Sequence, residues 1–282
     1  MDIQILNPSS AERFCSFFQH IKLFTEHINI TFTNEKMYMQ TMDSSRVSIV
    51  EIILPHNWFQ KYEIKNTNAI TIGINATILY KVLNARDKQQ NIQLTLDEKD
   101  DDKLKINFLS EDKTVFDKHF EIPLMELEIE VMEIPEFESD ADISLPSTYF
   151  AGIITQLQIF GDTIQFNCNE DRIDLTSLSV ESGKMKVCIG IDDITSYAIN
   201  EGENMDISFS LNRLHNICMY NKLSKEVEVL LTNNYPMKIT YLTTEQIHPQ
   251  TIVPVFCPQS KEMECVIIII FCERSSYKDI CK

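Results

Sequence analysis

Apolar and polar residues alternate with a period of two along most of the chain. Successive side chains of a strand point to opposite faces, so this alternation is typical of antiparallel sheets that bury one face. The clearest alternating segments are residues 28–33, 46–54, 92–96, 104–108, 163–168, 205–210 and 226–231. The pattern predicts a chain made mainly of antiparallel strands.

Helical spacing replaces this alternation in four segments. They cover approximately residues 9–24, 75–86, 146–160 and 210–222. In the first of them, Phe14, Phe17 and Ile21 recur at steps of three and four residues, which places them on one face of a helix. We therefore expect four helices among the strands.

The second half of the chain repeats the first at a distance of 136 residues. With this shift Phe14 falls on Phe150, and the strand segment 35–42 falls on 171–178. A single offset that serves both helices and strands indicates a tandem duplication. The predicted fold class is α+β, with each half built in the order helix, strands, helix, strands.

A segment without glycine, FEIPLMELEIEVMEIPE at residues 120–136, separates the two halves. It is apolar and acidic, and one interpretation is a further strand followed by a loop. Its position at the boundary favours an extended connector that crosses from one half to the other.

Length and composition allow a folded chain with a substantial core. The chain has 282 residues, of which 44% are hydrophobic and 24% are charged. Its formal net charge of −17 argues against a protein that binds nucleic acid with its whole surface. A locally basic face remains compatible with that charge.

Acidic residues avoid the four helical segments, although the chain contains 42 of them. Glu12 is the single acid in these segments. Their basic residues are Arg13, Lys22, Lys81, Arg86, Arg213 and Lys222. Duplex phosphates attract lysine and arginine and repel carboxylates, so these six residues are candidates to face DNA. The alternative is that the helices are merely rich in uncharged polar residues, as in segment 146–160, which has no basic residue.

Motifs for catalysis and cofactor binding are mostly absent from the sequence. The six glycines form neither a GxGxxG motif nor a phosphate loop, and the six histidines form no HExxH motif. No cysteine and histidine cluster has zinc spacing. We expect no enzymatic activity, no cofactor and no metal site, although the members of a hydrolytic triad need not be close in sequence. The acidic segment 97–103 is either a solvated hairpin loop or a site for a hard cation.

The eight cysteines are scattered without CxxC spacing, which indicates reduced thiols in an intracellular compartment. The first residues show no basic flank followed by an apolar run, so no secretory signal is expected. The longest apolar run, residues 266–272, is too short to span a bilayer. We therefore expect no membrane partner.

Three segments resemble the proliferating cell nuclear antigen family of DNA sliding clamps. MDSSRVSIVEI at residues 42–52 resembles a strand and turn of that family, and PLMELEIEVMEIPE at residues 123–136 resembles its interdomain connecting loop. PSTYFAGIITQLQIFGD at residues 146–162 resembles its third helix. The similarity covers about residues 1–245. It implies two similar domains per subunit and three subunits in a ring, with helices lining the hole and sheets outside.

This resemblance divides the chain into four parts. They are an N-terminal clamp domain (1–119), a connecting loop (120–136), a C-terminal clamp domain (137–256) and a divergent tail (257–282). The last strand is expected at QTIVPVF, residues 250–256, because this register keeps the spacing of the family without an insertion. The alternative register places that strand at residues 264–271.

The family's hole-lining lysines match Lys22 and Lys81. Gly152 and Thr155 stand where relatives carry arginines in the third helix, and Met219 stands at the position of a fourth-helix lysine. Lys222, one turn later, is a substitute. The resemblance thus implies a duplex that is encircled without sequence specificity and is held less strongly than usual.

A front pocket that receives partner peptides in this family matches several apolar positions of this chain. They are Met42, Ile49, Met132, Ile134, Pro236 and Val253. Apolar residues suit the insertion of an aromatic or aliphatic anchor. Arg46 stands at the rim in place of a histidine-like residue. Ordinary core packing is the alternative explanation for the apolar positions.

Together these inferences predict a DNA polymerase processivity factor that works in a nucleus or a viral replication compartment. Its expected partners are duplex DNA, a clamp loader, peptide-bearing proteins such as polymerases, and further copies of itself. The ring is expected to close through edge strands at residues 114–120 and 184–190. The alternatives are a subunit of a specialised heterotrimeric clamp, as in checkpoint signalling, and a peptide-docking scaffold that does not load on DNA.

Overall fold

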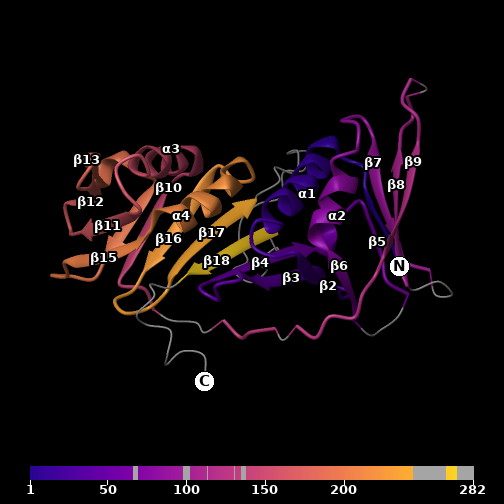
Figure 1. Cartoon of the computed structure of the whole chain (residues 1–282), viewed down its shortest axis with the longest axis horizontal. Helices are drawn as coiled ribbons and strands as arrows, with labels where there is room; N and C mark the ends of the chain where they lie inside the picture. Colours follow the sequence, from indigo (N-terminus) through magenta and orange to yellow (C-terminus); the bar gives the residue numbers. More distant parts are fainter. Residues whose placement is uncertain are drawn as a thin grey trace, which may run out of the picture.

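The computed structural model describes residues 1–65, 69–97, 102–112, 114–129, 131–134, 138–243 and 265–271. Two α+β halves lie side by side along the long axis of the molecule (Figure 1). The four helices lie on one side of the sheets, and the connector between the halves runs along the opposite side (Figure 1). No helix within the described ranges is long and apolar enough to cross a membrane.

Asparagine side chains define where the helices of the first half begin. Asn7 caps α1 (Pro8–Ile21) by accepting a hydrogen bond of 2.8 Å from the backbone N–H of Ser9, and Asn75 caps α2 (Ala76–Leu83) in the same way. Such caps provide partners for N–H groups that have none within the helix. The apolar face predicted for the first helix is buried.

The first half contains two groups of antiparallel strands. A five-stranded sheet has the order β5-β1-β7-β8-β9, and the other group has the order β4-β3-β2-β6. Their bounds are β1 Asp2–Ile5, β2 His27–Phe32, β3 Lys36–Met42, β4 Ser48–Pro55, β5 Lys61–Glu63, β6 Ile70–Asn75, β7 Asn91–Thr95, β8 Lys103–Leu109 and β9 Lys118–Pro123. A short 3-10 turn, His56–Trp58, follows β4.

The second half repeats this arrangement strand by strand. Its groups have the orders β14-β10-β16-β17-β18 and β13-β12-β11-β15, which match the two orders of the first half. The bounds are β10 Ala141–Pro146, α3 Ser147–Leu157, β11 Thr163–Cys168, β12 Arg172–Ser179, β13 Gly183–Gly190, β14 Ser196–Ile199, β15 Met205–Ser210, α4 Leu211–Cys218, β16 Glu226–Leu231, β17 Met237–Thr243 and β18 Cys265–Phe271. Short 3-10 turns follow β13 (Ile191–Asp193) and α4 (Met219–Lys222). The four predicted helices and the tandem duplication are confirmed.

Strand β18 joins the two halves into one nine-stranded sheet. It pairs with β17 on one side and with β4 on the other, so that Ile269 lies opposite both Ile239 and Val50. Ile267 and Ile269 are fully buried. The closing strand is therefore a central strand of the sheet.

The prediction that residues 250–256 form this last strand is wrong. The strand between β17 and β4 consists of residues 265–271, as in the alternative register. Residues 250–256 themselves lie outside the described ranges. A strand that pairs on both sides needs its backbone N–H groups, and Pro254 has none. Residues 265–271 contain no proline and consist mostly of β-branched residues, which suits a strand buried within a sheet.

The connector begins later than predicted, because β9 continues to Pro123 at the edge of the five-stranded sheet. Residues 120–123 thus belong to the first domain and not to the connecting loop. The predicted edge segment 114–120 is also corrected, since its first four residues precede the strand. The other predicted edge segment, 184–190, falls within β13 at the opposite end of the molecule (Figure 1).

Candidate DNA-facing helices and partner pocket

The helical layer continues across the boundary between the two halves. At this boundary His20 of α1 packs edge-on against Tyr220 of the turn after α4, with ring centroids 4.9 Å apart. Both side chains are buried. The four helices therefore form one surface on one side of the sheets (Figure 1).

The three predicted lysines lie at this surface. Lys81 is exposed in α2, and Lys222 is exposed in the turn after α4. The amino group of Lys22 lies 3.8 Å from the centroid of the Tyr80 ring, which lets the aromatic face stabilise its charge. These three cations come from both halves of the chain, and none of them forms an ion pair with a carboxylate in the part of the chain that the structure describes.

Two of these lysines also act on His20. Burial, together with the nearby charges of Lys222 and Lys22, lowers the pKa of the His20 imidazole to about 4. At neutral pH the ring is therefore uncharged. Lys22 and Lys222 are close enough to influence one buried group from two different helices.

The predicted arginines have other surroundings. The Nη1 atom of Arg86 donates hydrogen bonds to the carbonyls of Asp87, Lys88 and Gln90, at 3.2, 3.2 and 2.8 Å, so this arginine holds its own loop. Arg13 is half-buried. That Arg86 faces DNA stays a prediction, since these hydrogen bonds to its own loop neither place it at a duplex nor exclude it.

Arg213 also has a partner within the protein. Its guanidinium forms an ion pair of 3.0 Å with Asp43, on the turn between β3 and β4. This contact joins the helical layer of the second half to the sheet of the first half.

Apolar side chains occupy much of the remaining helix surface. Tyr149 and Ile159 of the third helical segment are 55% and 69% exposed, and Leu23 at the end of the first is 51% exposed. Gly152 and Thr155 lie on the same helix as Tyr149. The surface of the helical layer is thus only thinly basic.

On the other side of the sheets the connector crosses three strands in succession. The backbone N–H of Met125 donates to the carbonyl of Gly73 in β6, at 3.0 Å. The side-chain amide of Asn29 in β2 donates to the carbonyl of Leu127, at 3.1 Å. These bonds fix the path of the connector over the face of the sheet.

A reciprocal pair of hydrogen bonds fixes the connector at the third strand. The amide of Gln40 in β3 donates to the carbonyl of Met132 at 2.9 Å and accepts from the Met132 N–H at 2.8 Å. Gln40 and Met42 point to the same face of β3, and Met42 lies opposite Ile49 of β4. The structure thus brings three predicted pocket residues, Met132, Met42 and Ile49, to one region.

The other predicted pocket residues are placed as follows. Ile134 is half-buried on the connector, and Arg46 is exposed on the β3–β4 turn. Pro236 is buried immediately before β17. The first residue of β17 pairs with the last residue of β18, which pairs in turn with the first residue of β4. Pro236 therefore lies at the end of the sheet where β4 begins. Val253 lies outside the described residues.

Sequence reasoning missed Gly73, which permits the close approach of the connector. A Cβ atom at this position would lie 2.2 Å from the carbonyl oxygen of Met125 and 2.8 Å from the Leu127 side chain. A glycine inside the alternating strand ITIGIN was the available signal, because glycine in a strand often marks a close backbone approach. Gln40 and Asn29 gave no comparable signal.

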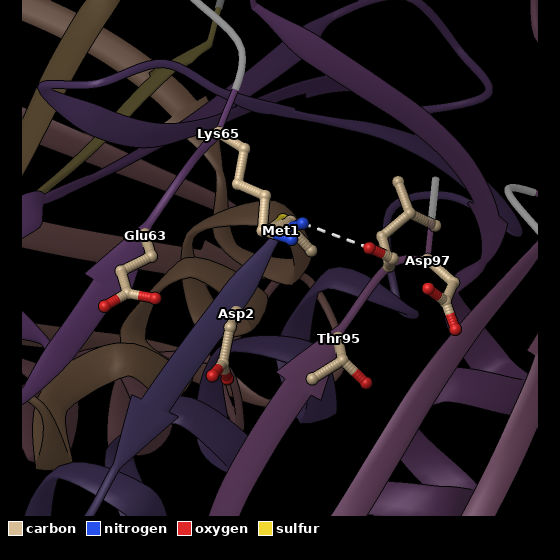
Figure 2. Close-up of a pocket in the computed structure, with 7 residues that line it drawn as sticks. Met1, Asp2, Glu63, Lys65, Thr95 and Asp97 are labelled. Atoms are coloured by element: carbon tan, nitrogen blue, oxygen red, sulfur yellow. Dashed lines mark hydrogen bonds between the residues drawn. The ribbon is translucent and has the colours of Figure 1, made fainter. Parts of the chain in front are cut away.

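A cavity of about 550 Å³ opens where β1, β5 and β7 end, and it is lined by Met1, Asp2, Glu63, Lys65, Thr95, Leu96 and Asp97 (Figure 2). Its carboxylates are matched by lysines. Lys61 binds Asp2 at 2.6 Å and Glu63 at 3.2 Å, and Lys105 binds Asp97 at 3.2 Å. These pairs are structural, and the cavity is separate from the residues predicted to bind DNA or peptides.

The remaining candidates for chemistry are metal-binding groups and free cysteine thiols. Within the described residues, no group of three or more histidine, cysteine, aspartate or glutamate side chains is placed to hold a metal ion. Cys15, Cys168, Cys188 and Cys218 are free thiols. Burial raises the pKa of the Cys168 and Cys218 thiols to about 12, so both stay protonated and unreactive at neutral pH.

Comparison with known proteins agrees with the repeated architecture. The profile described as "Proliferating cell nuclear antigen, N-terminal domain" matches residues 9–132, and the profile of the C-terminal domain matches residues 133–256. The chain is 27% identical over 225 residues to "Proliferating cell nuclear antigen" of Chaetomium thermophilum, which covers 78% of this chain and 85% of that protein. It is 22% identical over 229 residues to "Probable DNA polymerase sliding clamp 1" of Paramecium bursaria Chlorella virus 1, with 80% and 86% covered.

Proposed function

Because the chain belongs to the proliferating cell nuclear antigen family, we propose that it is a DNA polymerase processivity factor whose closed ring consists of three copies. The observation that carries this proposal is the doubled domain with all four helices on one side. Three copies would supply six similar domains, with the helices toward the hole. The mechanism is topological, since a closed ring cannot leave the duplex sideways.

Contact with DNA would be weak and independent of sequence. Lys22, Lys81 and Lys222 would attract phosphates through charge and counterion release. The near absence of acids from the helices avoids repulsion of the duplex. A thinly basic lining is compatible with this role, because a ring that cannot dissociate sideways does not need tight contacts.

The internal junction supplies a template for the contact between copies. Inside the chain, the last strand of the second half, β18, pairs with β4 of the first half. The equivalent strands by sheet order are β9 and β13, which are edges of their sheets at opposite ends of the molecule. Unpaired edges invite pairing, so β9 of one copy would pair with β13 of the next.

The same template gives a register for this contact. Ile269 of β18 lies opposite Val50 of β4 at the internal junction. Phe120 of β9 corresponds to Ile269, and Met185 of β13 corresponds to Val50. Phe120 of one copy would then lie opposite Met185 of the next, both being half-buried apolar side chains. One position further along, Glu121 would lie opposite Lys184, which pairs opposite charges.

The partner proteins would dock a peptide on the outer face. Met132, which Gln40 holds on the connector, would form an apolar region with Met42 and Ile49, with Ile134 and Pro236 at its margins. An aliphatic or aromatic anchor inserted there would supply most of the affinity. DNA polymerases and a clamp loader are the expected partners.

The protein would act as a scaffold without chemistry of its own, in a nucleus or a viral replication compartment. The relatives named as a nuclear antigen and as a viral sliding clamp support both locations. The small number of basic residues on the helical layer also suits the alternative function, a scaffold that docks peptides without loading on DNA.

Retention on DNA of different topology tests the proposal. After loading, the protein should remain on nicked circular DNA through gel filtration and should leave when the circle is cut at one site. Light scattering of the free protein should give the mass of three chains. Release from the intact circle at the same rate as from the linear form would contradict encirclement.

A further inference from the structure

Arg213 makes two contacts that point away from a duplex. Its Nη1 atom lies 3.0 Å from a carboxylate oxygen of Asp43, and its Nη2 atom donates to the hydroxyl of Ser45 at 3.0 Å. The side chain of Arg213 is only 23% exposed, and that of Asp43 only 18%. Two donors of one planar guanidinium thus engage two residues of a single turn.

The turn that Arg213 engages depends on the same carboxylate. The other oxygen of Asp43 accepts hydrogen bonds from the backbone N–H groups of Val47 and Ser48, at 2.7 and 2.8 Å. Between Asp43 and Val47, Arg46 adopts a left-handed conformation with φ of 54°, which is unfavourable for a residue with a side chain. The Asp43 carboxylate therefore holds a strained turn closed.

This turn connects the two strands that carry the proposed peptide pocket. Met42 directly precedes Asp43, Ile49 directly follows Ser48, and the two pair across the strands. Arg46 at the tip is the proposed rim residue. A change in the position of Asp43 would therefore move both strand ends at which an anchor is received.

We infer that Arg213 is a positioning residue of the peptide pocket and does not belong to the DNA lining. This inference rests on the proposed function of the pocket. Arg213 reaches from α4 of the second half to the β3–β4 turn of the first and fixes the geometry in which Met42 and Ile49 face a partner peptide.

Arg213→Lys separates the two roles because it keeps the positive charge but loses the planar fork. A pocket role predicts an affinity for a synthetic polymerase-tail peptide that is about tenfold weaker, the scale for loss of a charged hydrogen bond. Asp43→Asn should weaken the peptide similarly, and the double variant should be no weaker than either single variant. Association with DNA should keep its dependence on salt in Arg213→Gln, which removes the charge.

Lys81→Gln is the matched control, since it removes an exposed cation of the helical layer. It should leave peptide affinity unchanged and reduce the slope of log affinity for DNA against log salt by about one. Hydrogen exchange of the Val47 and Ser48 amides provides a readout without peptide, and it should be faster in Arg213→Lys than in Lys81→Gln.

The outcomes distinguish the inference from the function on which it rests. If the wild-type protein binds the peptide and Arg213→Lys binds it equally well, with unchanged exchange at Val47 and Ser48, the inference is overturned while the pocket stands. If the wild-type protein does not bind the peptide, the pocket and the assignment of Arg213 to it are both overturned. A salt slope that falls in Arg213→Gln as it does in Lys81→Gln would return Arg213 to the DNA lining.

Discussion

At the scale of single residues, neighbouring charges and burial decide what each side chain can do. His20 is 6% exposed, and the charges of Lys222 and Lys22, one from each half of the chain, act on its ring. Protonation of this ring would place a third positive charge beside Lys22 and Lys222 without water to solvate it. The imidazole therefore serves as a neutral packing group against Tyr220.

The neutral state of His20 predicts a loss of stability in mild acid. The unfolded chain takes up the proton near pH 6.5, whereas the folded protein does so near pH 4. Stability is thus fully present above pH 6.5 and declines as the pH falls toward 4, by on the order of 2–3 kcal/mol for this group. His20→Phe should flatten this part of the profile in thermal unfolding, and Lys222→Gln should reduce the decline. An unchanged profile in His20→Phe would assign the acid sensitivity to other groups.

Two adjacent connector residues provide a test of the peptide pocket. Met132 is half-buried and held by Gln40, whereas Val131 is 62% exposed. Met132→Ala should cost about 1–3 kcal/mol of peptide binding free energy, the range for interface anchors. Val131→Ala, a change of similar size, should cost little. Calorimetry with a polymerase-tail peptide measures both, and equal values would place the pocket elsewhere.

At the scale of elements, the connector is held by backbone contacts that depend on one small residue. Over its described residues, 124–129 and 131–134, it forms no continuous ladder with the sheet but meets it at Gly73, Asn29 and Gln40. Each of these contacts lies on a different strand, so the connector crosses the strands and does not extend the sheet. Its position is therefore sensitive to the width of the gap at Gly73.

Gly73→Ala should displace the connector, since the new methyl group would overlap the Met125 carbonyl. Overpacking of this kind costs about 1–3 kcal/mol. A protease specific for glutamate should cut the connector faster at Glu126 and Glu128, and peptide affinity should fall. Gly152→Ala is the control, because nothing lies within 4 Å of a Cβ there and alanine favours a helix by about 0.5–1 kcal/mol. Equal protection of the connector in both variants would contradict this role of Gly73.

At the scale of the whole molecule, the duplication solves the problem of unpaired sheet edges in two ways. One junction between domains is closed inside the chain by β18 and β4. In the proposed ring its equivalent, formed by β9 and β13, is closed by another copy. A head-to-tail contact of this kind gives a closed ring when the rotation from one copy to the next closes.

In the register of this contact, Glu121 of one copy lies opposite Lys184 of the next, so exchanging the two residues by mutation tests it. Glu121→Lys or Lys184→Glu places like charges opposite each other at every interface, and each such pair costs about 0.2–1 kcal/mol. In sedimentation, either single variant should dissociate at a higher protein concentration than the wild type, and the double variant should recover the trimer. Glu201→Lys, which makes the same charge change on an exposed turn, should leave assembly unchanged. Failure of the double variant to recover would show that the strands meet in another register.

The sequence alone determined the elements and their duplication. Periodicity is a local property, set by which side chains must face the core, so segments such as 28–33 and 9–24 were predicted correctly without knowledge of their neighbours. The constant offset between Phe14 and Phe150 likewise needed no structure, because both halves bury the same helix face.

Only the tertiary structure decided those features that depend on contacts between residues far apart in sequence. The last strand could be chosen only by which segment fits between β17 and β4, and the bonding groups of both neighbours favoured Cys265–Phe271 over a segment with a proline. A basic residue on a helix indicates attraction to phosphate, but Asp43, 170 positions away in sequence, engages Arg213 first. Such contacts depend on the distance between atoms after folding, and no local pattern in a single sequence records that distance.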